Sequence, residues 1–315
     1  MKIAFFTEGP TGVKYPRNFA NMRTDIAWMV ALNSDHYNVG VPTEYIRDHY
    51  DLGIIIVPKK NPEYVLNRLT VYKTACRQVA TMQEGPHHFW QDWSVNTQIQ
   101  YLQFLGSMDR IFCHNRYDKK YYRGLFPNIK VDILPSLMIE DAIPHLINKP
   151  RVGTMVGGNW VSWYSGQDSY FIAQDLEEPV FAPSMGRKQE YEDYLEDIIY
   201  LEYKVWSEWI EELNKVKYAV HLMRTWAAGT FALNCARLKI PCIGYGTSNT
   251  GCDTQFNLFP ELSVPLGDLE SARRIAKHLK TNELFYSHVA EYAHKMYMEQ
   301  YTEDKFLKKF NELYL

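Results

Sequence analysis

The stretch RTWAAGTFALNCARLKIPCIGYG, residues 224–246, decides the fold class of this chain. It begins with a turn at Gly229, continues through residues 230–238, which are apolar at helical spacing, and ends in the short apolar run 242–244 after a Lys-Ile-Pro break. A turn, a helix and a strand in this order predict the end of a β-α-β unit. The first N–H groups of such a helix are unpaired and carry the positive end of its dipole, so Gly229 and Thr230 are candidate phosphate-binding residues. An ordinary buried helix has the same pattern, and only the rest of the chain decides between the two.

The composition is that of a globular protein without a membrane anchor. Hydrophobic residues make up 46% and charged residues 23% of 315 positions, and the net charge of -3 neither requires nor excludes an anionic partner. No apolar run approaches the roughly 18 residues that a membrane span needs, and the start MKIAFFTEG has no signal-peptide pattern. The five cysteines form no C-x-x-C pair, which argues against structural zinc and favours a reduced compartment. We expect a cytoplasmic monomer, in the host cytoplasm if a phage encodes it.

The first half of the chain alternates strands with helices. Apolar runs at 2–7, 52–57, 78–83, 110–114 and 131–134 read as strands, and residues 23–32, 63–74, 96–106 and 116–123 read as helices. This alternation predicts a parallel, doubly wound sheet, whose ligands sit beyond the carboxyl ends of the strands. Glu8, Glu84 and His114 all fall at such ends.

Glu84 is the candidate catalytic residue of this half. It ends a strand in the turn Gly85-Pro86, next to two histidines and two aromatic residues. A carboxylate in partly apolar surroundings has a raised pKa and can act as a general base. The alternative is a Glu that caps the next helix or pairs with an Arg. His87 and His88 point apart and have no evident third ligand, so they do not predict a metal site.

Basic residues gather in two places in this half. Lys14, Arg17 and Arg23 follow the glycine loop 8–12, which either approaches a ligand or is a plain connection. Other basic residues lie at 59–60 and on the helix at 116–123, and all of them could meet the phosphates of an anionic acceptor or form a solvated face. The residues that we expect to contact an acceptor are Glu8, Arg23, His87, His114, Arg116 and Lys119.

The second half restarts the pattern after the Pro-bounded stretch 144–150, a credible domain boundary. Strands are expected at 151–156, 179–182 and 217–223, and helices at 170–176, 270–279 and 285–315. Residues 190–214 read as helical, apart from a break near Tyr203. Gly157 and Gly158 follow the first of these strands directly, so backbone or ligand can approach closely there.

Three patches of this sequence resemble the GT-B glycosyltransferases. GTFALNCARLKIPCIG, residues 229–244, is similar to the region where that family holds the nucleotide diphosphate, and its Pro241 falls on the family proline. VGTMVGGNW, residues 152–160, resembles the glycine turn that opens the nucleotide-binding domain. QVATMQEGPHHFWQDW, residues 78–93, is similar to the strand and turn that carry the catalytic Asp of phage DNA β-glucosyltransferases, with Glu84 in the Asp position.

The resemblance implies two Rossmann-like domains that face each other across a cleft, with a C-terminal helix that crosses back to the first. The domains expected are 1–147, with the helix 298–315 packed on it, and 148–297. It implies a metal-independent glycosyltransferase without a cofactor, which moves a sugar from a nucleotide diphosphate sugar, UDP-sugar favoured, to a hydroxyl acceptor. The residues expected to bind the donor are Gly157, Gly158, Asn159, Arg187, Arg224, Gly229, Thr230 and Asn234.

The sequence departs from the family pattern at two donor positions. Asn234 stands where the family has a ribose-binding Glu, and the usual basic residue after the glycine turn is absent, so Arg224 or Arg187 would supply that charge. The acceptor is either a hydroxymethylated base in double-stranded phage DNA or a glycan or lipid-linked hydroxyl. A non-catalytic nucleotide- or sugar-binding module is the alternative from another class. A Rossmann oxidoreductase is less favoured, because no G-x-G-x-x-G follows either first strand.

Overall fold

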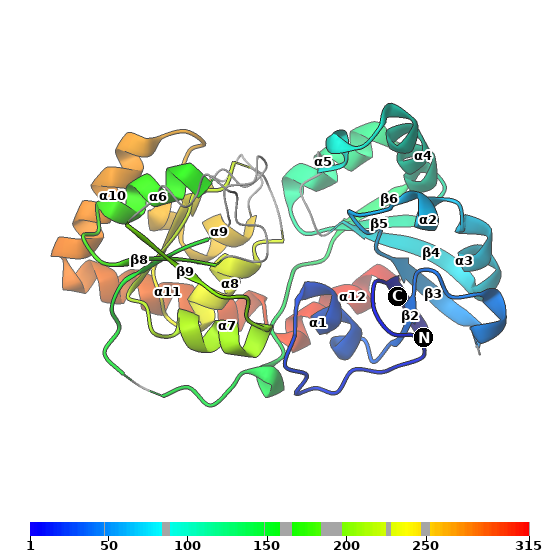
Figure 1. The fold of residues 1–315 in the computed structure, drawn as a ribbon, viewed down its shortest axis with the longest axis horizontal. Helices are drawn as coiled ribbons and strands as arrows, with labels where there is room; N and C mark the ends of the chain where they lie inside the picture. The colour runs from blue at the N-terminus through cyan, green and yellow to red at the C-terminus, as the bar shows by residue number, and fades with distance from the viewer. Residues whose placement is uncertain are drawn as a thin grey trace.

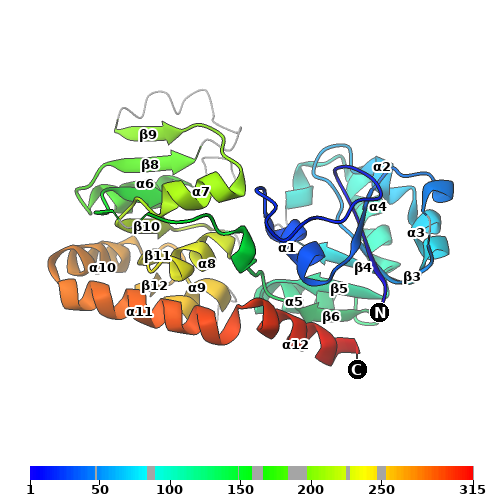
Figure 2. The same ribbon diagram turned by 90° about the horizontal axis from the view of Figure 1, so that it is seen from below.

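The computed structural model describes residues 1–46, 48–83, 89–147, 149–157, 166–183, 197–224, 228–246 and 253–314. Within these ranges the chain forms two six-stranded sheets, each with helices on both faces (Figures 1 and 2). Every strand pairing in both sheets is parallel. The α/β fold class that the sequence predicts is confirmed.

The first lobe, the part of the chain built on the first sheet, has the strand order β2-β1-β3-β4-β5-β6. Helices α1 and α12 lie on one side of this sheet and α2 to α5 on the other (Figure 1). The strands are β1 (Ile3–Thr7), β2 (Asp35–Asn38), β3 (Tyr50–Ile55), β4 (Cys76–Gln83), β5 (Arg110–Cys113) and β6 (Lys130–Ile133). The helices are α1 (Thr24–Ala31), α2 (Glu63–Leu66), α3 (Leu69–Ala75), α4 (Val95–Gly106) and α5 (Arg116–Leu125).

The second lobe, built on the second sheet, has the strand order β12-β11-β10-β7-β8-β9. Its strands are β7 (Thr154–Val156), β8 (Val180–Pro183), β9 (Ile198–Leu201), β10 (Tyr218–His221), β11 (Cys242–Tyr245) and β12 (Ser263–Val264). Its helices are α6 (Gly166–Gln174), α7 (Trp206–Leu213), α8 (Thr230–Arg237), α9 (Asp253–Leu258), α10 (Leu269–Thr281) and α11 (Glu283–Gln300). Helix α10 contacts α6, while α11 contacts α8 and α9 across the other face. Among the described helices none is both long and apolar enough to cross a membrane.

Neighbouring residues of the first sheet alternate between two cores. Phe5 and Ile54 pack with Trp28 of α1, whereas Phe6 and Ile55 belong to the core under α3 to α5. Successive side chains of a strand point to opposite faces, and both faces of this sheet are covered by helices. The continuous apolar runs that predicted these strands reflect this double burial.

The last helix leaves the second lobe and packs on the first. Helix α12 (Glu303–Tyr314) begins directly after α11 and lies beside α1 (Figure 2). Phe306, fully buried, has its ring 5.3 Å from that of Trp28, and the Phe310 ring lies 6.4 Å from that of Phe112. Arg17 pairs with Glu303 at the start of the helix. The expected return of the C-terminal helix to the first lobe is therefore present.

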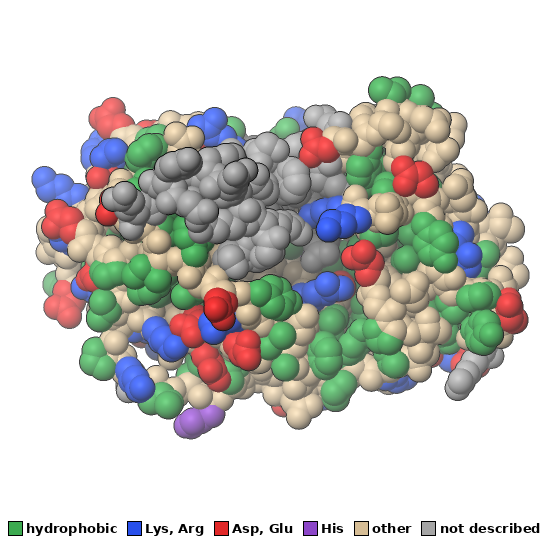
Figure 3. Space-filling view, viewed as in Figure 1, with side chains coloured by type: hydrophobic (Ala, Val, Ile, Leu, Met, Phe, Trp, Pro, Cys, Tyr) green, Lys and Arg blue, Asp and Glu red, His purple; other side chains and the backbone are tan. Residues whose placement is uncertain are grey.

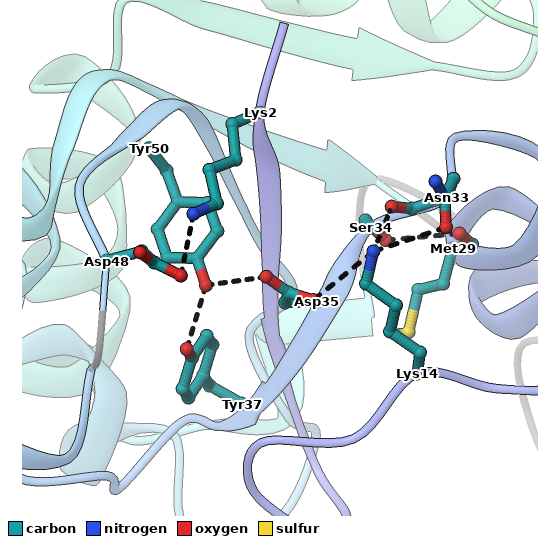
Figure 4. Close-up of polar contacts among 9 residues, drawn as sticks. All are labelled: Lys2, Lys14, Met29, Asn33, Ser34, Asp35, Tyr37, Asp48 and Tyr50. Atoms are coloured by element: carbon teal, nitrogen blue, oxygen red, sulfur yellow. Dashed lines mark hydrogen bonds and ion pairs between the residues drawn. The ribbon is translucent and has the colours of Figure 1, made fainter.

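A polar network joins the amino ends of the strands of the first sheet (Figure 4). The buried Tyr50 hydroxyl donates to Asp35 Oδ2 over 2.8 Å and lies 2.8 Å from the Tyr37 hydroxyl. Lys14 Nζ lies 3.6 Å from Asp35, and Lys2 Nζ lies 2.6 Å from Asp48. Burial raises the pKa of Tyr50, so its phenol stays protonated as a donor. This network holds the edge strand β2 at the end of the sheet opposite to the expected ligand end.

Three local predictions were wrong. Residues 198–201, predicted as helix, form strand β9, which pairs with β8 from Val180↔Ile198 to Pro183↔Leu201. An Ile-Ile-Tyr-Leu run suits an open sheet edge, and pairing there outweighs helical periodicity. Strand β2 was missed because its sequence, Asp-His-Tyr-Asn, lacks an apolar run. The single helix expected at 63–74 is two helices, since the chain turns at residues 67–68.

Candidate functional site

The second sheet has its topological switch point between β7 and β10. From β7 the chain proceeds outward to β8 and β9, then returns to place β10 on the other side of β7. In open parallel sheets, the loops that leave two such strands separate and make a crevice at their carboxyl ends, where ligands bind. Gly157 follows β7 and Arg224 follows β10, so the structure brings these two predicted donor-site residues to this point.

Gly157 has no room for a side chain. A Cβ at this position would lie 2.6 Å from the His221 ring and 3.0 Å from the Phe231 ring. The Gly157 N–H donates to Val220 O over 2.7 Å, so the turn stays attached to β10 where it leaves the sheet. The glycine predicted from the sequence is thus required by close packing against the end of β10 and the start of α8.

Gly229 and Thr230 form the start of α8. Gly229 caps the helix with φ of +73°, and a Cβ there would lie 2.4 Å from Thr254 Cβ. Positive φ is the conformation that glycine adopts without strain. The Thr230 hydroxyl lies 3.0 Å from the hydroxyl of Thr24, the first residue of α1. Two helix N-termini therefore meet between the lobes, and their converging positive dipole ends favour an anion there.

Arg224 is held by a buried carboxylate. Its Nε and Nη2 donate to Asp168 Oδ2 and Oδ1 over 2.9 and 3.1 Å. Asp168 lies in the first turn of α6 and also accepts a hydrogen bond from the Tyr245 hydroxyl over 2.8 Å. The hydrogen bonds from Arg224 to Asp168 and the attraction between the two charges raise the pKa of Arg224. The guanidinium is thus an oriented, permanently charged group on a side chain that remains 56% exposed.

Asn234 is buried in α8, one turn beyond Thr230. Its side-chain oxygen has no hydrogen-bond partner among the described residues. A buried acceptor without a partner is costly, and a ligand hydroxyl that donates to it would remove that cost. Asn234 is therefore an unsatisfied acceptor within the described part of the chain.

Sequence reasoning missed three residues of this region: Asp168, Tyr245 and His221. Asp168 and Tyr245 contact Arg224 or each other only after residues from α6, β10 and β11 come together, so no local spacing marks them. His221 ends β10 with its ring 4.9 Å from that of Phe231. Burial lowers the pKa of His221 to about 4, so its imidazole is neutral at pH 7. Its position at a strand end was the available signal.

The predicted general base, Glu84, follows a strand end that is firmly fixed. Gln83, the last residue of β4, accepts hydrogen bonds from the buried hydroxyls of Tyr101 in α4 and Tyr122 in α5, over 2.7 and 3.0 Å. Its own amide donates to Thr81 Oγ1 over 3.0 Å. The chain therefore reaches position 84 from a rigid point at the carboxyl end of the first sheet.

Several predicted site residues lie outside the described residues. They are Glu84, His87, Gly158, Asn159 and Arg187. Their roles stay predictions from the sequence. Within the described ranges, no three His, Cys, Asp or Glu side chains gather in a way that could hold a metal ion.

The predicted acceptor residues of the first lobe differ in exposure. Glu8 is exposed directly after β1, and Arg23 at the start of α1 pairs with the buried Asp25 through Nε over 2.8 Å. His114 is only 3% exposed, and its ring lies 5.4 Å from that of Trp28. Burial lowers the pKa of His114 to about 4. In this structure the His114 ring belongs to the core and offers no surface to an acceptor.

Helix α5 lies on the side of the first lobe nearer to the second lobe (Figure 1) and carries a basic surface of four Lys and Arg side chains, at 116, 119, 120 and 123. Asn115 caps the helix by accepting from the Asp118 N–H over 2.8 Å. Lys119 lies 3.9 Å from Asp132 and keeps a third of its side chain exposed. Figure 3, seen from the same side as Figure 1, shows Lys and Arg side chains near the middle of the face in view. A hollow of about 380 Å³ is lined by Arg116, Lys119, Lys120, Arg123 and Gly124.

Comparison with known proteins gives matches among solved structures alone. No family model matches this sequence, and no curated protein matches it. Sucrose-phosphate synthase from Thermosynechococcus elongatus superposes with a TM-score of 0.69 at 10% identity, over 99% of this chain and 98% of that one. A phage α-glucosyltransferase, solved with UDP-glucose and DNA containing an abasic site, gives 0.64 at 13% identity over all of both chains.

A larger enzyme is also similar. TarM from S. aureus, solved with UDP, gives a TM-score of 0.59 at 10% identity over 83% of this chain, which spans 55% of the TarM chain. These neighbours are GT-B glycosyltransferases. The two six-stranded parallel sheets, the switch point between β7 and β10 and the returning helix α12 agree with that fold. The chain has the GT-B fold that its three sequence patches led us to expect.

Proposed function

We propose that this protein is a glycosyltransferase that moves a sugar from a nucleotide diphosphate sugar, UDP-sugar favoured, to a hydroxyl group. The proposal rests on the groups that come together at the switch point of the second sheet. Gly157 comes from the segment that leaves β7, and Arg224 and the start of α8 come from the segment that leaves β10; the two segments meet there. A backbone turn that a ligand can approach closely, a helix N-terminus and a guanidinium group together can bind a diphosphate.

The donor site would act on the leaving group. Negative charge builds on the diphosphate as the bond to the sugar breaks, and fixed donors aimed at that charge lower the barrier. The N–H groups at Gly229 and Thr230 and the Arg224 guanidinium would supply this stabilisation, with Arg187, Gly158 and Asn159 as further candidates. Asn234 would accept a hydrogen bond from a sugar hydroxyl. UDP-bound neighbours with the same fold support this assignment.

Glu84 would deprotonate the acceptor hydroxyl, which attacks the anomeric carbon of the donor. The bond from oxygen to that carbon forms as the bond to the diphosphate breaks, and the proton passes to the Glu84 carboxylate. Gln83, fixed by Tyr101 and Tyr122, supports the placement of this base at the carboxyl end of the first sheet. No metal ion is needed for this scheme.

A hydroxymethylated base in double-stranded DNA is the acceptor that we favour. The basic surface of α5 supports this choice, because Lys and Arg side chains neutralise phosphates. A base would have to leave the stack to reach Glu84. The neighbour solved with DNA and UDP-glucose has the same fold over its whole length. A glycan or lipid-linked hydroxyl is the competing acceptor.

Sugar transfer to a DNA duplex that contains 5-hydroxymethylcytosine tests the reaction and its base. Glu84→Gln should lower the rate about 100-fold or more, since a general base contributes at least that much. Glu211→Gln, on the exposed face of α7, should transfer at the wild-type rate. If the Glu84→Gln rate stays within about threefold of wild type, Glu84 is not the base.

Salt tests the DNA acceptor separately. Affinity for the duplex should fall steeply between 50 and 200 mM salt, and the Lys119→Ala plus Lys120→Ala variant should lower the slope of log affinity against log salt by about 2. Binding that does not respond to salt would exclude DNA. Transfer to a glycan or lipid-linked acceptor in its place would leave the glycosyltransferase assignment and correct the acceptor.

A further inference from the structure

Asp168 is a buried carboxylate with two different partners. Only 4% of the residue is exposed, and its two oxygens accept from both Nε and Nη2 of Arg224. Oδ2 also accepts from the hydroxyl of Tyr245, which is 2% exposed at the end of β11. A two-point contact between a carboxylate and a guanidinium fixes the plane and direction of the guanidinium.

A second contact fixes the segment that carries Arg224. The side chain of Ser169, next to Asp168 in α6, accepts from the Leu222 N–H over 2.8 Å. The start of α6 therefore holds both the backbone and the side chain of the segment that leaves β10. Three connections that begin at the ends of β7, β10 and β11 are joined in this way at the switch point.

The ion pair leaves one edge of Arg224 for a ligand. The hydrogen bonds to Asp168 use Nε and Nη2, Nη1 makes none to the described residues, and more than half of the side chain is exposed. The Asp168 charge meanwhile cancels part of the long-range attraction that Arg224 exerts on an anion. The pair thus weakens the Coulomb attraction between Arg224 and an anion but fixes the orientation of the guanidinium. If attraction matters more, removing the Asp168 charge should tighten anion binding. If orientation matters more, it should weaken anion binding.

We propose that Asp168, held by Tyr245, is a positioning residue that aims Arg224 at the diphosphate of the donor. This inference rests on the proposed function, because it concerns the same donor site. Orientation outweighs charge in this account: a fork held in place binds phosphate oxygens at two points without first losing side-chain freedom.

A double-mutant cycle on the full chain tests the proposal, with UDP, pyrophosphate and uridine as probes. Asp168→Asn should weaken UDP and pyrophosphate binding by about tenfold, although it adds a net positive charge. Binding of uridine, measured by ligand-observed NMR, should change less than about twofold, because uridine has no phosphate. Tyr245→Phe should act in the same direction by about threefold. Asp175→Asn removes a partly buried carboxylate from its pair with Arg273 and serves as the matched control, with wild-type UDP affinity.

Measuring the effect of Asp168→Asn in a protein that already carries Arg224→Ala shows whether Asp168 acts through the arginine. In that background Asp168→Asn should cause no further loss of UDP affinity. The proposal is overturned if Asp168→Asn tightens UDP binding or leaves it unchanged, if the loss persists without Arg224, or if uridine binding falls equally. Tyr245→Phe is put through the same cycle, so a poorly folded Asp168 variant does not end the test. A wild-type protein that binds no UDP and no pyrophosphate overturns the proposed donor site itself.

Discussion

At the scale of single residues, the proposed donor site contains two glycines that no larger residue can replace, because neighbouring side chains fill the space beside them. Gly157 and Gly229 were expected from the sequence because each follows a turn at the edge of a regular element. The structure adds the reason: His221 and Phe231 fill the space beside Gly157, and Thr254 fills that beside Gly229. Only tertiary packing supplies such neighbours.

Gly157→Ala should disturb both the fold and the donor site. Its methyl group would have to displace the His221 ring, which costs about 1–3 kcal/mol of unfolding free energy. The same movement should weaken UDP binding. Gly124→Ala is the control, because a Cβ at this helical position meets nothing within 4 Å. That change should leave stability equal or raise it by up to about 1 kcal/mol. Equal urea midpoints for Gly157→Ala and wild type would contradict the packing argument.

The residues that the sequence did not predict are those that hold other side chains in place. Arg224 was predicted because the basic residue usual after the glycine turn is absent and Arg224 could supply its charge. Its partner Asp168 lies 56 residues away in the chain, and Tyr245, which holds Asp168, ends a strand that no site motif marked. His114 shows the opposite case: its strand-end position predicts an accessible residue, but α1 covers the ring with Trp28. Position on a sheet was predictable here, and side-chain burial was not.

At the scale of elements, the central strands were predicted well, whereas the edge strands β2 and β9 were not. Central strands such as β3 need apolar residues at nearly every position, which leaves a clear signal. Edge strands β2 and β9 are stabilised mainly by pairing with a neighbouring strand. The sequence of β2, Asp-His-Tyr-Asn, and the acidic, helix-like segment that contains β9 therefore did not predict strands. The returning helix α12 was expected from family resemblance, and its contacts came from the structure.

Removing the main contact of α12 should destabilise the first lobe. Phe306 is fully buried against Trp28, so Phe306→Ala should lower the free energy of unfolding by about 3–5 kcal/mol. Lys305→Ala, at the exposed neighbouring position, should change it by less than about 0.5 kcal/mol. Urea unfolding followed by tryptophan fluorescence measures both. A Phe306→Ala loss no larger than that of the control would show that α12 does not stabilise this lobe.

At the scale of the whole molecule, polar contacts join the two lobes. Thr24 meets Thr230, Ser136 donates to Ala228 O over 2.9 Å, and the Ser207 N–H donates to Ala20 O over 2.8 Å. We propose that the lobes are domains, residues 1–147 with 298–315 and residues 148–297. A monomeric state and a cytoplasmic location stay predictions from the sequence.

The segment that joins the lobes is fixed to the second one by a carboxylate. Glu140 accepts from Arg237 over 2.7 Å and from the Tyr297 hydroxyl over 2.7 Å. Burial alone would raise the pKa of Glu140, but the hydrogen bonds from Arg237 and Tyr297 outweigh it and lower the pKa below its usual value. A lowered pKa means that the stabilisation is present above the unfolded-state pKa and is lost as pH falls through the folded-state value.

Glu140→Gln should therefore reduce stability at pH 7 and lose its effect in acid. Because half of the Glu140 side chain is exposed, we expect a difference from wild type of about 1 kcal/mol, after allowance for solvent screening. The gap should close as pH falls below about 4. Urea titrations between pH 3 and 7 measure it, with Glu211→Gln as the exposed control. A gap that is the same at every pH would contradict the role assigned to the Glu140 charge.

The central claim is that the second lobe binds a nucleotide diphosphate sugar. A thermal-shift screen of the wild-type chain against nucleotide diphosphate sugars tests it most directly. At 100 times its dissociation constant, a true donor should stabilise the protein by about 2.7 kcal/mol, with UDP-sugars ranked first, and the shift should shrink in the Arg224→Ala variant. No shift with any nucleotide diphosphate sugar, or an equal shift with and without Arg224, would contradict the account.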